Sequence, residues 1–194
     1  VADVAQHPLV LAGERGAHMV PSFHADLVRG VASYWVEFFA SFATGEAPEV
    51  VFVPIGLGSG ICACAAARAH AGVRTRIVGV VSAHAPAYRL SFEAGRAIEA
   101  PVSTQLADGM ACRVPEPQAL AIIQREVDEI VSVSDDEVAA AMRAFFADTH
   151  NVAEGAGAAA LAALLQQRER WAGRRVGLSL SGGNVDSAQF ARVL

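Results

Sequence analysis

The residues best suited to chemistry in this sequence form a glycine-rich stretch, VFVPIGLGSGI, at positions 51–61. Its first three residues, β-branched and aromatic, are typical of a buried strand. Gly56, Gly58 and Gly60 let backbone amides approach a ligand closely. The alanine-rich run that follows predicts a helix ending at Gly72. A strand, a glycine loop and a helix N-terminus together form an anion site, usually for phosphate; the alternative is a tight turn that binds nothing.

A dinucleotide is the first phosphate ligand to consider, but the loop does not fit one. Ile61 stands where the third glycine of GxGxxG would be. The fingerprint also needs an acidic residue about 20 positions further on to hold a ribose. No Asp or Glu occurs from Val50 through Phe92, which disfavours a Rossmann-type nucleotide binder. A P-loop is excluded because all 15 basic residues are arginine and the chain has no lysine.

Strand and helix patterns alternate along the chain. The alternation predicts an α/β fold with a mainly parallel twisted sheet flanked by helices, in one domain over residues 1–194. Ser134 and Glu137 form a capping box, and Gly45 is the expected end of an aromatic-rich helix. The predicted helices are 2–15, 31–45, 61–72, 88–95, 137–150 and 155–171, and the predicted strands are 18–20, 50–54, 76–81, 129–134 and 175–180.

The composition excludes several classes of protein. A formal net charge of -5 with scattered arginines argues against a nucleic-acid surface. No apolar run approaches the roughly 20 residues of a membrane span. Three cysteines give no disulfide framework, so we interpret them as core residues in a reducing compartment and expect a cytoplasmic location.

Four motifs resemble, in order and spacing, the pyridoxal-phosphate-dependent serine/threonine dehydratases, fold-type II enzymes that include serine racemase. They are PIGLGSGI, LADGMA, VAEGAGAAALAAL and LSLSGGNVD, and the resemblance extends upstream to LAGERGA. It implies the large domain of a tryptophan synthase beta-like enzyme with pyridoxal phosphate as cofactor. The implied reaction converts a small amino acid, L-threonine, L-serine or a 3-hydroxy acidic amino acid, to a 2-oxo acid and ammonia.

The resemblance also implies roles for particular residues. Backbone amides of the loop would wrap the cofactor phosphate. The loop residues are Gly56, Leu57, Gly58, Ser59 and Gly60. The leucine and serine replace glycines of the family, which is tolerable if both avoid positive φ. Ser181 would hydrogen-bond the pyridine nitrogen and leave the ring largely unprotonated. Glu154 would lie on the pyridine side, or would act only as a helix N-terminal acid.

The absence of lysine sets this chain apart from the family. The lysine that binds the cofactor and removes the substrate proton lies upstream in these dehydratases. The chain begins Val1-Ala2-Asp3 rather than with methionine, so we expect a C-terminal half without a catalytic residue of its own, inactive alone. Apolar surface left without the other half would favour a homo-oligomer or association with that half. The alternative is a non-catalytic remnant that binds phosphate or nothing.

Four further residues are relevant to metal binding or catalysis. Val81 stands where many relatives carry a glutamate that helps bind a cation, so we expect no metal site. We interpret His84 as a loop histidine and His150 as a helix-end cap. Asp108 is expected to form a turn before a glycine.

Overall fold

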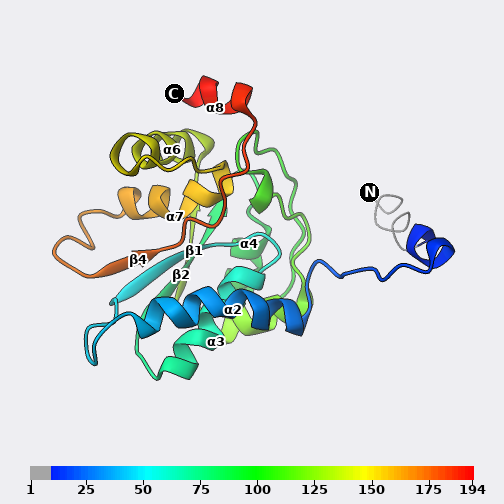
Figure 1. The fold of residues 1–194 in the computed structure, drawn as a ribbon, viewed down its shortest axis with the longest axis horizontal. Coiled ribbons are helices and arrows are strands. Elements are labelled where there is room, and N and C mark those ends of the chain that lie inside the picture. The colour runs from blue at the N-terminus through cyan, green and yellow to red at the C-terminus, as the bar shows by residue number, and fades with distance from the viewer. Residues whose placement is uncertain (1–9) are drawn as a thin grey trace.

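The computed structural model describes residues 10–194. The described residues contain a four-stranded sheet in which all neighbouring strands are parallel, in the order β3-β2-β1-β4 (Figure 1). The strands are β1 (Val50–Pro54), β2 (Arg76–Ser82), β3 (Glu129–Val133) and β4 (Val176–Leu178). The predicted α/β class with a mainly parallel sheet is confirmed.

Helices cover both faces of the sheet. In Figure 1, α2 and α3 lie below the strands and α6 and α7 lie above them. Side chains of α4 and α5 join the cluster of α2 and α3, and α8 joins that of α6 and α7. The helices are α2 (Ala25–Ala40), α3 (Ser59–Ala71), α4 (Ala87–Ala94), α5 (Pro117–Glu126), α6 (Asp135–Thr149), α7 (Gly155–Gln166) and α8 (Ser187–Val193), with a short 3-10 helix η1 (Asp108–Met110).

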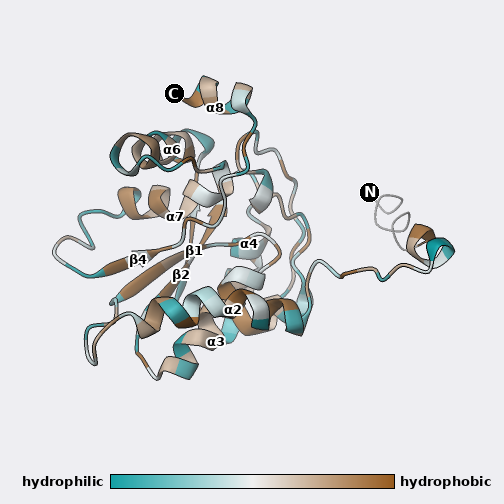
Figure 2. Cartoon of the chain, viewed as in Figure 1, coloured by the Kyte–Doolittle hydropathy of each residue, from teal (hydrophilic) through white to brown (hydrophobic). Residues whose placement is uncertain are grey.

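Successive side chains of β1 enter opposite layers of the core. Val51 and Val53 pack with α2 and α3, whereas Val50 and Phe52 pack with α6 and α7. A strand covered on both faces needs apolar residues at every position, which explains its continuous apolar run. Figure 2 shows the apolar colouring concentrated in the strands and in α7. No helix of residues 10–194 is both long and apolar enough to cross a membrane.

Strand β1 is the topological switch point of the sheet, because β2 and β3 are added on one side of it and β4 on the other. From β1 the chain passes through α3 to β2, and through α4 and α5 to β3, on one face of the sheet. It then returns through α6 and α7 on the other face to β4, which pairs with the free side of β1. Ligands of open α/β sheets bind beyond the carboxyl ends of the strands at such a switch point. The fold therefore directs attention to the loops that follow β1 and β4.

The prediction of a strand at 18–20 is wrong. These residues are extended but pair with no strand of the described chain, and Val20 is 69% exposed. A β-branched or apolar sequence forms a strand only where a neighbour supplies ladder hydrogen bonds. Of the predicted helix 2–15, residues 10–15 are helical, and 1–9 lie outside the described residues. In Figure 1 this short helix lies apart from the body of the molecule, at the end of the extended segment.

The expected end of the aromatic-rich helix at Gly45 is also wrong. Helix α2 ends at Ala40, and Ser41 is its C-cap, where the hydroxyl donates to the carbonyl oxygen of Phe38 at 2.7 Å. Gly45, with φ 81, belongs to the following turn. Two helices, α5 and α8, were not predicted, and α7 and β4 are shorter than expected.

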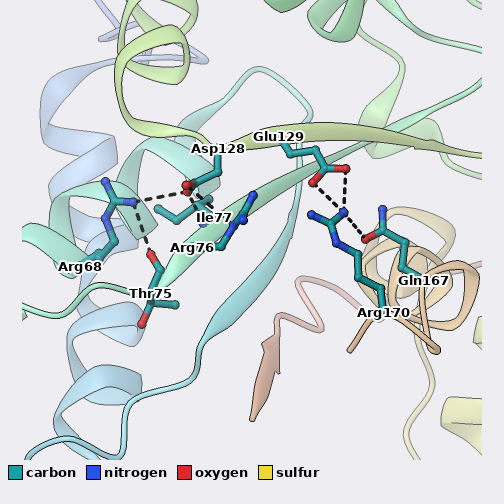
Figure 3. Close-up of polar contacts among 8 residues, drawn as sticks. All are labelled: Arg68, Thr75, Arg76, Ile77, Asp128, Glu129, Gln167 and Arg170. Atoms are coloured by element: carbon teal, nitrogen blue, oxygen red, sulfur yellow. Dashed lines mark hydrogen bonds and ion pairs between the residues drawn. The ribbon is translucent and has the colours of Figure 1, made fainter. Parts of the chain in front are cut away.

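A polar network ties the amino ends of β2 and β3 to α3 (Figure 3). The Asp128 carboxylate accepts a hydrogen bond from the Ile77 amide at 2.8 Å and lies 3.9 Å from the guanidinium groups of Arg68 and Arg76. Glu129, the next residue, pairs with Arg170 at 2.9 Å on the other side of the sheet. These contacts fix the β2–β3 register at the end of the sheet opposite the loops that follow β1 and β4.

We expect Asp128→Ala to lower the free energy of unfolding by about 1–3 kcal/mol, because the Ile77 amide loses its only acceptor among the described residues. Asp128→Asn keeps an oxygen acceptor and should lose less than about 1 kcal/mol. Glu129→Gln, which weakens an exposed pair, is the matched control. Urea titrations of the three variants measure these differences. Equal losses in the alanine and asparagine variants would contradict the role given to the amide.

Candidate active site

The loop after β1 has the backbone that an anion site requires. Gly58 takes φ 102 and ψ -2, and an added Cβ would stand 2.7 Å from the Cβ of Ala119. Neither Leu57 nor Ser59 has a positive φ, so the condition for tolerating these two replacements is met. Gly56 packs directly against the backbone of Gly109. A Cβ at Gly56 would collide with the Gly109 carbonyl oxygen.

A buried tyrosine holds the loop from behind. Tyr88 of α4 donates its hydroxyl to the carbonyl oxygen of Leu57 at 2.7 Å and accepts from the Glu116 amide at 3.0 Å. Burial raises the pKa of Tyr88, so the phenol remains a donor throughout the physiological range. The same tyrosine therefore joins the loop to the start of α5.

The N-terminus of α3 opens directly from this loop. The first helical hydrogen bond runs from the Cys62 amide to the carbonyl oxygen of Gly58 at 3.0 Å. The amides of Ser59, Gly60 and Ile61 consequently have no helical carbonyl to bind. Together with the helix dipole they favour an anion in front of the helix.

The opposite wall follows β4. Ser179, Leu180 and Ser181 line it, and Ser181 is exposed. The Ser179 hydroxyl is buried, in a residue only 8% exposed, and has no hydrogen-bond partner in the described part of the chain. Buried polar groups are normally satisfied, so an unpaired hydroxyl beside a cleft is a notable feature of the site.

Glu154 joins this wall to α7. Its amide donates to the carbonyl oxygen of Gly182 at 3.0 Å, and its carboxylate packs directly against Gly182. The side chain occupies the N-cap of α7 but makes no capping hydrogen bond. Gly157 allows the close approach, because a Cβ there would collide with the Gly182 carbonyl. The small residues of VAEGAGA thus let α7 meet the SGGN segment backbone to backbone.

All of the predicted site residues line one cleft of about 470 Å³ at the carboxyl edge of the sheet. They are Gly56, Leu57, Gly58, Ser59, Gly60, Glu154 and Ser181. Sequence reasoning missed Tyr34 of α2 and Ser179 in this lining. Neither residue was singled out from the sequence, since Tyr34 lies in no motif named above and Ser179 precedes the serine of SGGN.

Two of the larger hollows carry less chemistry. One of about 660 Å³ lies between the ends of α2 and α3 at the amino edge of the strands, away from any glycine loop. Another of about 960 Å³ lies between the extended segment from His18 and the loop residue Leu57. Neither combines free helix N-terminal amides with the switch point, so we assign the site to the smaller cleft.

The other residues considered above occupy structural positions. His150 caps α6 in the left-handed conformation with φ 57, as expected, and His84 is an exposed loop residue. Asp108 begins the short helix η1 before Gly109. In residues 10–194, no group of three or more His, Cys, Asp or Glu side chains is arranged to hold a metal ion.

The switch point, the amide-rich loop and the serine wall define an α/β protein with a cleft suited to a phosphate. The chain belongs to the pyridoxal-phosphate dependent enzyme family, whose model matches residues 2–182. It is 38% identical over 176 residues to an L-threonine ammonia-lyase of Geobacter sulfurreducens, covering 89% of this chain and 42% of that protein. A second L-threonine ammonia-lyase, from Thermotoga maritima, is 33% identical over 146 residues, covering 75% of this chain and 36% of that protein.

Solved structures agree with this assignment. A bacterial threonine deaminase, from the source abbreviated T.th., superimposes with a TM-score of 0.83 at 31% identity, covering 91% of this chain and 65% of that one. The processed form of threonine deaminase isoform 2 from Solanum lycopersicum superimposes with a TM-score of 0.87 at 25% identity. The match covers 97% of this chain and 55% of that one. The chain thus spans less than two thirds of these relatives. The resemblance to the dehydratases, the fold-type II architecture and pyridoxal phosphate as the cofactor of the parent enzyme are confirmed.

The residues present fit the cofactor without a covalent link. The loop offers amides to a phosphate, and its glycines leave room that side chains would fill. The wall after β4 offers the Ser181 hydroxyl and the unpaired Ser179 hydroxyl to a polar ring. The missing element is the lysine, which occurs nowhere in the 194 residues.

Gly58→Ala tests the loop against a matched glycine. Gly58 and Gly72 both have positive φ, so alanine costs about 1–2 kcal/mol at either position. Only the Gly58 methyl group would collide with Ala119, whereas the space around Gly72 is open. We expect Gly58→Ala to lose roughly 1–3 kcal/mol more than Gly72→Ala in urea unfolding. Equal losses would contradict the tight packing of the loop.

Proposed function

We propose that this chain is the cofactor-phosphate-binding part of a pyridoxal-phosphate-dependent ammonia-lyase. The proposed parent enzyme converts L-threonine or L-serine to a 2-oxo acid and ammonia. The observation that carries the proposal is the meeting of the glycine loop, Ser181 and Glu154 in one cleft at the switch point of the sheet. The names of the relatives, L-threonine ammonia-lyase above all, support the substrate class.

The proposed role of the chain is to bind and orient. Amides of Gly56 to Gly60 hold the phosphate, and the N-terminus of α3 stabilises its charge. The Ser181 hydroxyl donates one hydrogen bond to the pyridine nitrogen without transferring its proton. When bound, pyridoxal phosphate supplies the electron sink for loss of the α-proton and the β-hydroxyl group. A neutral partner at the ring nitrogen gives a weaker sink than a carboxylate would, which suits β-elimination.

The proton-removing lysine must come from polypeptide outside these 194 residues, because the chain contains none. We therefore propose that the chain alone is inactive. The greater length of the relatives is consistent with a further segment that carries this residue. We propose that the substrates of the parent enzyme are small amino acids and that no nucleic acid is a partner.

The surface beside the cleft supports association with such a segment. Met19, Val20, Leu27 and Leu57 are exposed apolar residues around the hollow of about 960 Å³ next to the glycine loop. Clustered apolar side chains of this kind mark interaction surfaces. We propose that the lysine-bearing segment covers them, and that pairing of two copies of this chain is the alternative.

A reducing, cytoplasmic location is also proposed. Cys62, Cys64 and Cys112 are buried and free. Burial raises the pKa of the Cys62 thiol to about 12 and raises that of the other two, which keeps all three thiols protonated and unreactive.

The purified chain should bind pyridoxal phosphate reversibly and form no product from L-threonine or L-serine. Dialysis should remove the cofactor, and borohydride should fix none of it to a side chain, since no lysine is available. Adding the N-terminal part of the Geobacter sulfurreducens relative should produce 2-oxobutyrate from L-threonine. The same part with its cofactor lysine changed to alanine is the control.

Three results would alter the proposal in different ways. Product formation by the chain alone would contradict the inactive half. Cofactor binding without activity in any mixture would favour the alternative, a non-catalytic remnant. Absence of cofactor binding would remove the cofactor role of the cleft.

A further inference from the structure

The hydroxyl of Tyr34 lies beside the phosphate-binding loop, although it comes from a different helix. Tyr34 of α2 lines the cleft, one turn after Val31. Its hydroxyl oxygen stands 4.0 Å from the position that a Cβ would take at Gly60, in the first turn of α3. This is a van der Waals distance, so the phenol lies directly beside the first turn of α3.

The two tyrosines of the chain differ sharply in how their hydroxyl groups are used. Tyr88 is 1% exposed and uses its hydroxyl in two hydrogen bonds that hold the loop. Tyr34 is 41% exposed, and its hydroxyl bonds to no other residue among 10–194. The free hydroxyl is therefore available to a ligand in the cleft.

The neighbouring tryptophan positions this phenol. The rings of Tyr34 and Trp35 lie 5.1 Å apart at an interplanar angle of 35°. Among residues 10–194, the buried indole N–H of Trp35 has no hydrogen-bond partner. The contact with this buried ring restrains the phenol of Tyr34, which lines the cleft.

The charge balance of the cleft favours such a donor. None of the described lining residues is Arg or His, and the chain has no lysine. A phosphate dianion would be bound by backbone amides and the dipole of α3 alone. Burial raises the pKa of Tyr34 to about 12, so the phenol stays protonated wherever the phosphate is doubly ionised.

We propose that the Tyr34 hydroxyl donates a hydrogen bond to the ligand phosphate, adding a side-chain contact from α2 to the loop of backbone amides. This inference rests on the proposed cofactor role of the cleft. Hydrogen bonds to charged groups contribute about 1.5–3 kcal/mol, so loss of the hydroxyl corresponds to roughly a 10-fold to 100-fold change in affinity. Tyr34 is then a binding residue that no sequence motif marks.

Calorimetric titration of the 194-residue chain with pyridoxal phosphate, pyridoxal and inorganic phosphate tests this role. Tyr34→Phe keeps the ring and removes only the hydroxyl. We expect it to bind pyridoxal phosphate and inorganic phosphate about 10-fold or more weakly, with pyridoxal affinity unchanged. Ser33→Ala removes a hydroxyl that bonds the Gly30 carbonyl within the same helix, and should leave all three affinities unchanged.

The possible outcomes separate this inference from the proposed function. Unchanged phosphate affinity in Tyr34→Phe, with tight binding by the parent chain, would overturn the role of Tyr34 alone. Equal weakening for pyridoxal and pyridoxal phosphate would assign Tyr34 a structural role and also overturn it. A parent chain that binds pyridoxal phosphate no more tightly than pyridoxal would overturn the phosphate site itself, and with it the contact from Tyr34. Urea unfolding of both variants verifies that each retains the stability of the unsubstituted 194-residue chain.

Discussion

Holding a phosphate dianion with neutral donors, the role we propose for the cleft, is the physical constraint that explains most of this structure. The chain has no lysine, and no arginine or histidine lines the described cleft. Several amides must therefore converge on one point, which requires the left-handed turn at Gly58 and a helix that begins immediately after it. Convergence of this kind is stable only if the loop is rigid, since every mobile residue would lose conformational entropy on binding. The hydrogen bonds of Tyr88 and the packing of Gly56 on Gly109 supply that rigidity.

The alanine-rich composition serves the same constraint. The two loops of the site leave neighbouring strands and must stay close while their helices cover opposite faces. Gly155 meets the backbone of Leu106, and Gly157 meets that of Gly182, so larger side chains would push the cofactor wall outward. Glycine within a helix lowers the stability of that helix. Here the cost is offset by burial of almost the whole of α7 between the sheet and its neighbours.

The sequence allowed the loop, Ser181 and Glu154 to be predicted because each follows or opens a regular element with a recognisable pattern. Parallel strands bring such ends together at one edge, so order along the chain was sufficient. Tyr34 and Ser179 were missed because their positions depend on how α2 lies across α3 and β4, which no local pattern encodes. The prediction of a strand at 18–20 was wrong for a related reason, since a strand requires a neighbouring strand with which to pair. Helix α5, by contrast, carried readable signals in the Glu116 cap and Pro117 at its first turn.

The electrostatics of the two walls fit a ring that stays largely neutral. Glu154 brings a carboxylate to the cleft, and a lone carboxylate near a pyridine nitrogen would favour its protonation. That carboxylate sits at the N-cap of α7, where the helix dipole offsets part of its charge. Its packing against Gly182 also directs it at the SGGN backbone, where it lies beside the segment that presents Ser181. The hydroxyl of Ser181, which carries no charge, then remains the nearest partner expected for the ring nitrogen. On this arrangement, the chain can hold an acidic residue in its cofactor cleft and still act through a neutral hydrogen bond.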